Sequence, residues 1–241
     1  MSSETPSPAK KLNLERASNF MRQFRDPDSR ELKKLSANQF MEVWSHYDRD
    51  GNGYIEGTEL DGFLKEFAVS DSMLVELKAY GESMTQMNFL RDLLKEAKKI
   101  NDVSEDKLIE YTDTMLQVFD SNKDGRLQLS EMAKLLPVKE NFLCRQVFKG
   151  ATKLTKDDIE RVFSLYDRDN NGSIENEELR GFLKDLLELV KKDYDAQDLL
   201  EFEETILQGV EYSSEGKISR KQLTMILLAL AKHNQEEDPE T

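Results

Sequence analysis

DRDGNGYIEGTE, residues 48 to 59, is a stretch in which acidic and amide side chains recur at fixed intervals. Counted from Asp48, these side chains stand at positions 1, 3, 5, 9 and 12. Gly53 occupies position 6 and the apolar Ile55 occupies position 8. An acidic turn after a helix does not require the glycine and the apolar residue at these places. The stretch therefore predicts a loop that directs its oxygens toward one point.

The chemistry that suits such a loop is the binding of a hard cation. Ca²⁺ takes six to eight oxygen ligands at about 2.3–2.6 Å, and a twelve-residue loop can supply them. Asp48, Asp50 and Asn52 would each give one side-chain oxygen. Tyr54 would give its backbone carbonyl, and Glu59 would close the site with both carboxylate oxygens. The glycine at position 6 permits the positive φ of the sharp turn. We therefore expect a Ca²⁺ site here, with Mg²⁺ as a competitor.

The same pattern occurs twice more, as DSNKDGRLQLSE at 120–131 and DRDNNGSIENEE at 167–178. Seven constrained positions that occur three times are not explained by acidic turns alone, so we predict three calcium loops. The expected ligands are Asp120, Asn122, Asp124, Arg126 (by its carbonyl) and Glu131 in one loop, and Asp167, Asp169, Asn171, Ser173 (by its carbonyl) and Glu178 in the other.

A fourth frame, EYSSEGKISRKQ at 211–222, departs from the pattern. Gly216 matches the turn glycine and Ile218 the apolar position. Glu211 is a long side chain at position 1, and Gln222 replaces the glutamate that would bind through two oxygens. We expect this degenerate loop to fold and to pair with its neighbour, but to bind calcium poorly.

Helices are predicted on both sides of each loop, so the fold class is all-α, with short antiparallel β pairing between loops. Before the loops, apolar residues recur at helical spacing in 36–47, 104–119 and 155–166. Ser36 and Gln39 have the spacing of a capping box, and Thr155 marks another helix start. Matching stripes follow Glu59 and Glu178. We expect these stripes to form the core.

Composition limits the function. The chain has 241 residues and a formal net charge of −14, which argues against nucleic acid as a partner. No apolar run approaches the roughly 20 residues that cross a bilayer, so stable membrane insertion is not expected. The lone Cys144 fits a reducing compartment, where we expect it to be a buried linker thiol. One cysteine and two histidines offer no recognisable catalytic set, so we do not expect an enzyme.

The chain resembles the EF-hand superfamily and, more narrowly, the calbindin–calretinin–secretagogin group, with its insect branch as the nearest match. The narrower resemblance lies in YTDTMLQVFDSNKDGRLQLSEMAKLLPVKENFL (111–143) and ENEELRGFLKDLLE (175–188). It implies a calcium-binding protein of the cytoplasm, with the nucleus as a second location. Members carry six EF-hands in one globular chain and act as calcium buffers with some sensor behaviour.

This chain departs from that group in the middle. MNFLRDLLKEAKKI at 87–100 resembles the exit helix of a third hand, but LVELKAYGESMT before it has no ligand pattern. The chain therefore looks like a six-hand protein that lacks roughly its second loop and most of its third hand, with an orphan exit helix at 88–99. We expect loops 48–59 and 120–131 to pair with each other; the rival outcome is that both have lost their partners.

The expected organisation has five parts. They are a flexible polar arm (1–35), an EF-hand region (36–136), a linker (137–153), an EF-hand pair (154–232) and an acidic tail (233–241). The nine methionines are scattered and not gathered on exit helices, which favours a calcium buffer. The alternative is a sensor that exposes an apolar surface to protein targets when calcium binds.

Overall fold

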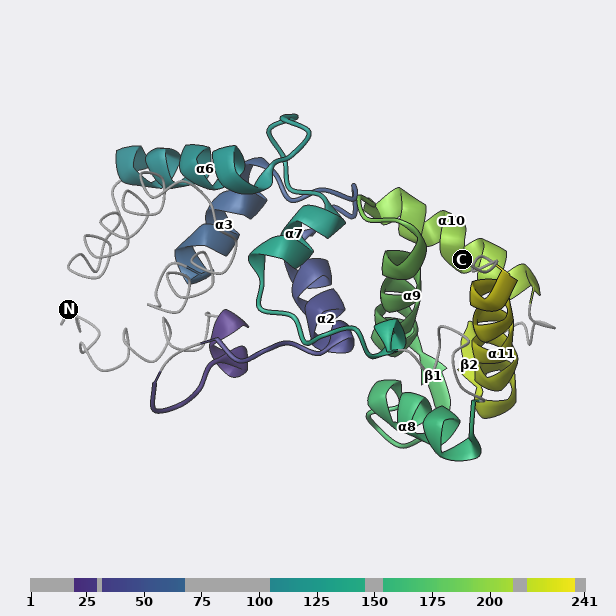
Figure 1. Cartoon of the computed structure of the whole chain (residues 1–241). Coiled ribbons are helices and arrows are strands. Elements are labelled where there is room, and N and C mark those ends of the chain that lie inside the picture. The colour runs from purple at the N-terminus through teal and green to yellow at the C-terminus, as the bar shows by residue number, and fades with distance from the viewer. Residues whose placement is uncertain (1–19, 30–31, 68–104, 146–153, 210–215, 237–241) are drawn as a thin grey trace, which may run out of the picture. The chain divides into compact units, whose positions relative to one another are not determined.

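The computed structural model describes residues 20–29, 32–67, 105–145, 154–209 and 216–236 (Figure 1). The expected orphan helix at 88–99 and the first positions of the fourth loop lie outside the described residues. The segment expected as an acidic tail is described to residue 236, where α11 ends, and residues 237–241 lie outside the described residues. The linker is described up to residue 145.

The described elements are helices joined by loops, with one small sheet. In chain order they are η1 (Phe20–Phe24), α2 (Ala37–Tyr47), α3 (Gly57–Phe67), α6 (Glu105–Phe119), α7 (Leu129–Leu135), η3 (Phe142–Cys144), α8 (Lys156–Tyr166), β1 (Ser173–Glu175), α9 (Asn176–Val190), α10 (Ala196–Gly209), β2 (Lys217–Ser219) and α11 (Arg220–Glu236). The predicted all-α fold with short antiparallel pairing is confirmed.

Helix starts follow local capping chemistry. The Ser36 hydroxyl accepts the Gln39 N–H at 3.2 Å, and the Gln39 amide oxygen accepts the Ser36 N–H at 3.0 Å. Thr155 and Asp158 form the same reciprocal pair at the start of α8. These contacts satisfy backbone N–H groups that have no partner within the helix. Both predicted capping positions are confirmed.

The predicted apolar stripes form the core. In α2, the residues of the predicted stripe, Phe40, Val43, Trp44 and Tyr47, are all buried. Equivalent residues on the exit helices α3 and α9 are buried too: Leu60, Phe63, Leu64, Leu179, Phe182 and Leu183. Burying such side chains contributes about 1.5–3 kcal/mol each, which makes this periodicity the main stabilising feature of each hand.

The chain divides into two compact units. The first contains residues 1–33 and 56–118, and the second contains 34–55 and 119–241. In the first unit, η1 packs against α3, with Met21 and Phe24 buried. The Arg25 guanidinium donates to the carbonyls of Glu66 and Phe67 at 3.1 and 3.0 Å. Part of the segment expected as a flexible arm therefore makes specific contacts.

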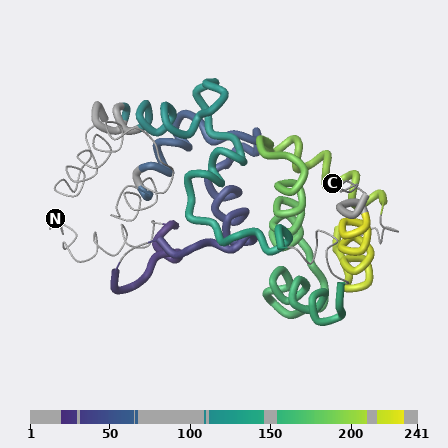
Figure 2. Tube along the Cα trace, in the orientation of Figure 1, coloured from purple at the N-terminus to yellow at the C-terminus, as the bar shows by residue number. Residues whose placement is uncertain are grey.

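In the second unit, α2 lies against α9. Helices α8 to α11 succeed one another along the chain and are coloured from green to yellow in Figure 2. The close approach depends on Gly181 in α9. A Cβ atom there would lie 2.6 Å from Asn38 Oδ1 and 2.8 Å from the Asn38 backbone nitrogen. Asn38 also donates its side-chain N–H to the Tyr166 carbonyl at 2.9 Å, which joins α2 to the end of α8.

A buried ionic network lies beside this contact. Lys184 is only 1% exposed, and its Nζ lies 2.7 Å from Glu188 Oε1 and 3.3 Å from Asp185 Oδ1. The Tyr166 hydroxyl donates to Asp185 Oδ2, and the Tyr194 hydroxyl donates to Glu188 Oε1, each at 2.6 Å. Burial raises the pKa of Tyr166 well above its usual value, so this hydroxyl keeps the proton that it donates.

Two further observations concern the surface. Cys144 is exposed, which corrects the expectation of a buried linker thiol; it lies in η3, where the buried residue is its neighbour Leu143. None of the helices that the structure describes carries an apolar stretch of the length and hydropathy needed to span a bilayer.

Candidate metal centres

The loops are joined in pairs by their apolar eighth positions. Ile55 and Leu127 exchange both backbone hydrogen bonds, at 2.9 and 3.1 Å, in an antiparallel bridge. In the second pair, Ile174 lies opposite Ile218 in the β1–β2 sheet. All four side chains are buried. The expectation that loops 48–59 and 120–131 pair with each other is confirmed.

The three complete loops share one internal geometry. In each, the aspartate at position 1 accepts a hydrogen bond from the N–H of the glycine at position 6, at 3.2, 2.8 and 3.1 Å in chain order. These glycines are Gly53, Gly125 and Gly172, with φ of 86°, 80° and 85°. A residue with a Cβ rarely adopts such angles, which is why glycine stands at this position.

Loop 167–178 shows the clearest cation site. Asp167, Asp169 and Glu178 each offer a carboxylate oxygen, and these oxygens lie within 4.8 Å of one another. Asp167 follows the last residue of α8, where its N–H bonds to the Phe163 carbonyl, and Glu178 lies in the first turn of α9. Three carboxylates this close repel one another unless a cation lies between them.

The closing glutamate, Glu178, indicates whether this loop suits a metal ion. Its Oε1 accepts the Arg168 N–H at 2.8 Å. Its Oε2 is buried and accepts no hydrogen bond from the residues that the structure describes. A buried carboxylate oxygen that lacks a partner is energetically costly, and a metal ion would satisfy it. The three carboxylates of this loop therefore fit Ca²⁺, which in loops of this kind binds the closing glutamate through both oxygens.

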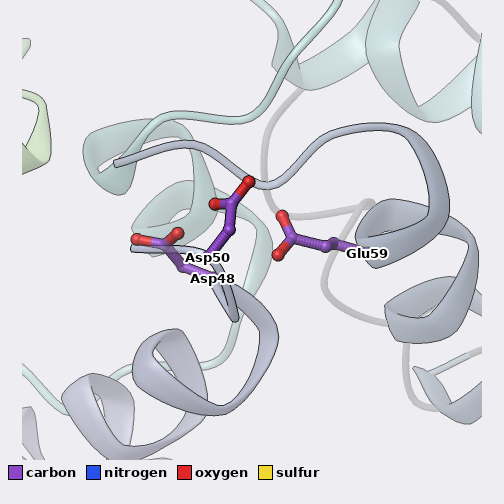
Figure 3. A group of neighbouring side chains, drawn as sticks. All are labelled: Asp48, Asp50 and Glu59. Carbon is purple, nitrogen blue, oxygen red and sulfur yellow. The ribbon is translucent and has the colours of Figure 1, made fainter. Parts of the chain in front are cut away.

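Loop 48–59 brings its acids together in the same way. Oxygens of Asp48, Asp50 and Glu59 lie within 4.8 Å of one another, and Figure 3 shows the three side chains as neighbours. The Asn52 amide oxygen accepts the Tyr54 N–H at 2.9 Å, which holds that predicted ligand in the turn. Three of the five residues that the sequence predicts as ligands here therefore lie together, and all three belong to one loop.

Loop 120–131 differs. Its carboxylates do not form such a group of three, although the structure describes every residue of this loop. Both oxygens of Glu131 already accept backbone N–H groups, from Ser121 at 2.7 Å and from Gln128 at 3.1 Å. Burial raises the pKa of Glu131, and the nearby Asp120 adds to this rise. The loop therefore carries the expected acidic residues, but its closing glutamate is already occupied by backbone N–H groups.

The degenerate fourth loop uses its last residue for structure. The Gln222 amide oxygen accepts the Ser219 N–H and hydroxyl, each at 2.8 Å, at the start of α11. A neutral amide occupied in this way offers less to a cation than a carboxylate does. The described part of the loop agrees with a pairing role.

A cavity of about 270 Å³ lies beside loop 48–59, lined by α2, the loop and the start of α10. Trp44, the only tryptophan, lines it four residues before Asp48. A Cβ at Gly53 would lie 3.1 Å from the Ala196 side chain, so loop and helix approach closely here. Trp44 can therefore report locally on this loop.

Comparison with known families places the chain in a defined class. Residues 37–136 match the model of an EF-hand domain pair, and residues 158–186 match that of an EF hand domain. The protein therefore belongs to the EF-hand family, whose members bind calcium in loops of this spacing.

Individual relatives narrow the group. The chain is 62% identical to calbindin-32 of Drosophila melanogaster in an alignment 303 positions long, which covers 96% of this chain and 98% of the relative. It is 34% identical to calretinin of Homo sapiens, over 81% of this chain and 93% of that protein. Calbindin of Gallus gallus gives the same 34%, over 81% and 95%. The chain is thus a calcium-binding EF-hand protein of the calbindin–calretinin group.

Proposed function

We propose that the protein is a cytoplasmic, non-enzymatic calcium buffer with three sites, in loops 48–59, 120–131 and 167–178, where Mg²⁺ competes. The observation that carries this proposal is the group of carboxylates in loop 167–178 with the buried, unpartnered Oε2 of Glu178. The repeated bond from the position-6 N–H to the position-1 carboxylate extends it to the other two loops.

We prefer a buffer to a sensor because the large apolar side chains that are exposed in the described residues are spread over several helices. The exposed large apolar side chains in the described residues belong to five helices: Ile109 (α6), Leu165 (α8), Val190 (α9), Leu200 (α10), Met225 and Leu228 (α11). A sensor needs a contiguous, often methionine-rich groove. The alternative, a sensor that presents such a groove to protein targets, predicts a large calcium-dependent rise in binding of an apolar dye.

We also propose that the chain is a shortened six-hand protein. The alignment with calbindin-32 is 303 residues long, whereas this chain has 241, so the relative carries residues without a counterpart here. Loops 48–59 and 120–131 lie within a single match to an EF-hand pair and exchange backbone bonds. On this proposal, loss of the intervening hands leaves two loops that pair with each other.

The first test is a calorimetric calcium titration of the full chain, which we expect to give three sites. Replacing the closing glutamate in turn, by Glu59→Gln, Glu131→Gln and Glu178→Gln, should remove one site each time. Each replaced site should lose at least about 10–100-fold in calcium affinity, since replacing even a residue that only hydrogen-bonds to a metal ligand has an effect of that size. Trp44 fluorescence should lose its calcium response most in Glu59→Gln.

The matched control is Glu140→Gln, the same change at an exposed residue outside the loops. It should leave three sites. A native chain that takes up one calcium ion, lost only in Glu178→Gln, would contradict the three-site proposal. Strong calcium-dependent dye binding by a three-site chain would instead favour the sensor.

A further inference from the structure

The second loop of each pair carries a cation at its seventh position, Arg126 in one pair and Lys217 in the other. The first loops carry Tyr54 and Ser173 at that position. A calcium loop uses only the backbone carbonyl of its seventh residue, so the side chain has no part in the ligand set. What the two cations touch is therefore a separate question.

Arg126 lies between the two loops of its pair. Its guanidinium nitrogen is 3.5 Å from Asp124 Oδ2, and Asp124 is the expected ligand at position 5 of the same loop. The guanidinium carbon is 3.9 Å from the centre of the Tyr54 ring, on the partner loop. An arginine stacked on a ring in this way is held by a cation–π interaction as well as by the ion pair.

Lys217 makes the corresponding contact in the other pair. Its Nζ lies 3.8 Å from Glu175 Oε2, and the two residues are opposite each other in the β1–β2 register. Glu175 is the acid at position 9 of loop 167–178. Its Oε1 also accepts a hydrogen bond from the expected ligand Asn171, at 3.1 Å. The degenerate loop thus brings a positive charge to the acidic rim of a calcium loop.

We propose that Arg126 and Lys217 are resident counter-ions that lower the calcium affinity of the loops whose carboxylates they touch. This inference rests on the proposed three-site function. An ion bound about 2.3–2.6 Å from Asp124 would share that carboxylate with the guanidinium. Two cations on one carboxylate repel each other, so binding must weaken the ion pair or move the arginine. Lys217 acts less directly, because it offsets the acid at position 9.

The ring of Tyr54 makes the arginine effective. An exposed ion pair at 3.5 Å is weak, because both side chains lose freedom and salt screens the attraction. Stacking on Tyr54 reduces that freedom and holds the charge beside Asp124. Because Tyr54 belongs to the partner loop, the effect depends on pairing. This would make loop 120–131 weaker than its ligand list alone suggests.

The test isolates loop 120–131 in a parent that carries Glu59→Gln and Glu178→Gln. Adding Arg126→Gln should raise its calcium affinity about two- to five-fold at low salt, in line with the strength of exposed ion pairs, and the gain should shrink toward zero near 1 M KCl. The matched control is Lys123→Gln, which removes the same charge from an exposed residue of the same loop and should raise affinity less.

A second readout needs no calcium. In the chelated full chain, Arg126→Gln should lower the midpoint of thermal unfolding by about 1–4 °C, through loss of the ring contact. Calcium affinity and metal-free stability should therefore move in opposite directions. In a parent that carries Glu59→Gln and Glu131→Gln, Lys217→Gln should raise the affinity of loop 167–178 by a smaller factor.

The experiment distinguishes a failure of the counter-ion inference from a failure of the three-site proposal. If loop 120–131 binds calcium but Arg126→Gln leaves its affinity unchanged, lowers it, or raises it no more than Lys123→Gln does, the inference is overturned while the proposed function stands. If loop 120–131 binds no calcium with either residue at 126, the three-site proposal and the role of Arg126 both fall.

Discussion

Replacing the buried Lys184 by alanine should lower the free energy of unfolding of the metal-free protein by about 3–5 kcal/mol. The ammonium lies against the carboxylates of Asp185 and Glu188, and its Nζ is 5.1 Å from the centre of the Phe40 ring on α2. Without the cation, Asp185 is left as a buried acid in a place where burial already raises its pKa. Denaturant unfolding in the presence of a chelator measures the loss.

Two further variants separate charge from packing. Lys184→Met keeps most of the apolar stem, so its difference from Lys184→Ala reports the lost packing. Combining Lys184→Met with Asp185→Asn removes the charge of the buried acid as well, and this variant should regain much of the stability, since a buried ion pair can often be replaced by neutral residues at little cost. A Lys184→Met variant as stable as the native chain would show that the charge has no stabilising role.

The contribution of Asp185 to the free energy of unfolding should change with pH in a definite direction. Burial raises the pKa of Asp185 in the folded protein above its ordinary value, so the folded form holds that proton more tightly than the unfolded form does. The stability that this contributes is present at low pH and is lost as pH rises through the folded pKa. The charge of Lys184 lowers the pKa of Asp185, so Lys184→Met should raise that pKa further. The deficit of Lys184→Met should therefore shrink between about pH 7.5 and about pH 5.

Local chemistry explains what the sequence could predict. The ligand spacing, the turn glycines and the caps at Ser36 and Thr155 involve residues close together in the chain. An apolar residue at position 8 needs a partner, which favours the pairing of loops 48–59 and 120–131 over the rival in which both have lost their partners. These features require no knowledge of how distant helices meet.

Contacts between distant helices could not be read in this way. Lys184 stands in a charged segment, FLKDLLE, where a lysine is ordinarily solvated, and it is buried only because α2 lies against α9. The loop pattern predicts a role for the carbonyl of Arg126 alone, since its side chain meets Tyr54 only once the loops pair. A signal did exist: both second loops carry a cation at position 7.

Alanine at Gly181 should lower the free energy of unfolding by about 1–3 kcal/mol, the usual range for overpacking. Alanine ordinarily stabilises a helix relative to glycine by about 1 kcal/mol, so the local preference points the other way. Here the new Cβ would lie 2.6–2.9 Å from atoms of Asn38 and Ala37, two of them backbone atoms of α2. A backbone cannot rotate out of the way as a side chain can, so α2 must move.

The repeat supplies a matched control at Gly62. ELDGFL at 59–64 and ELRGFL at 178–183 place both glycines at the same point of an exit helix. Among the residues that the structure describes, a Cβ at Gly62 would meet nothing within 4 Å, so Gly62→Ala should raise the free energy of unfolding by about 0.5–1 kcal/mol. Parallel denaturant titrations of the two chelated variants measure both changes. Opposite signs are expected from one substitution in two copies of one motif, and stabilisation by both would show that α2 and α9 are not in close contact.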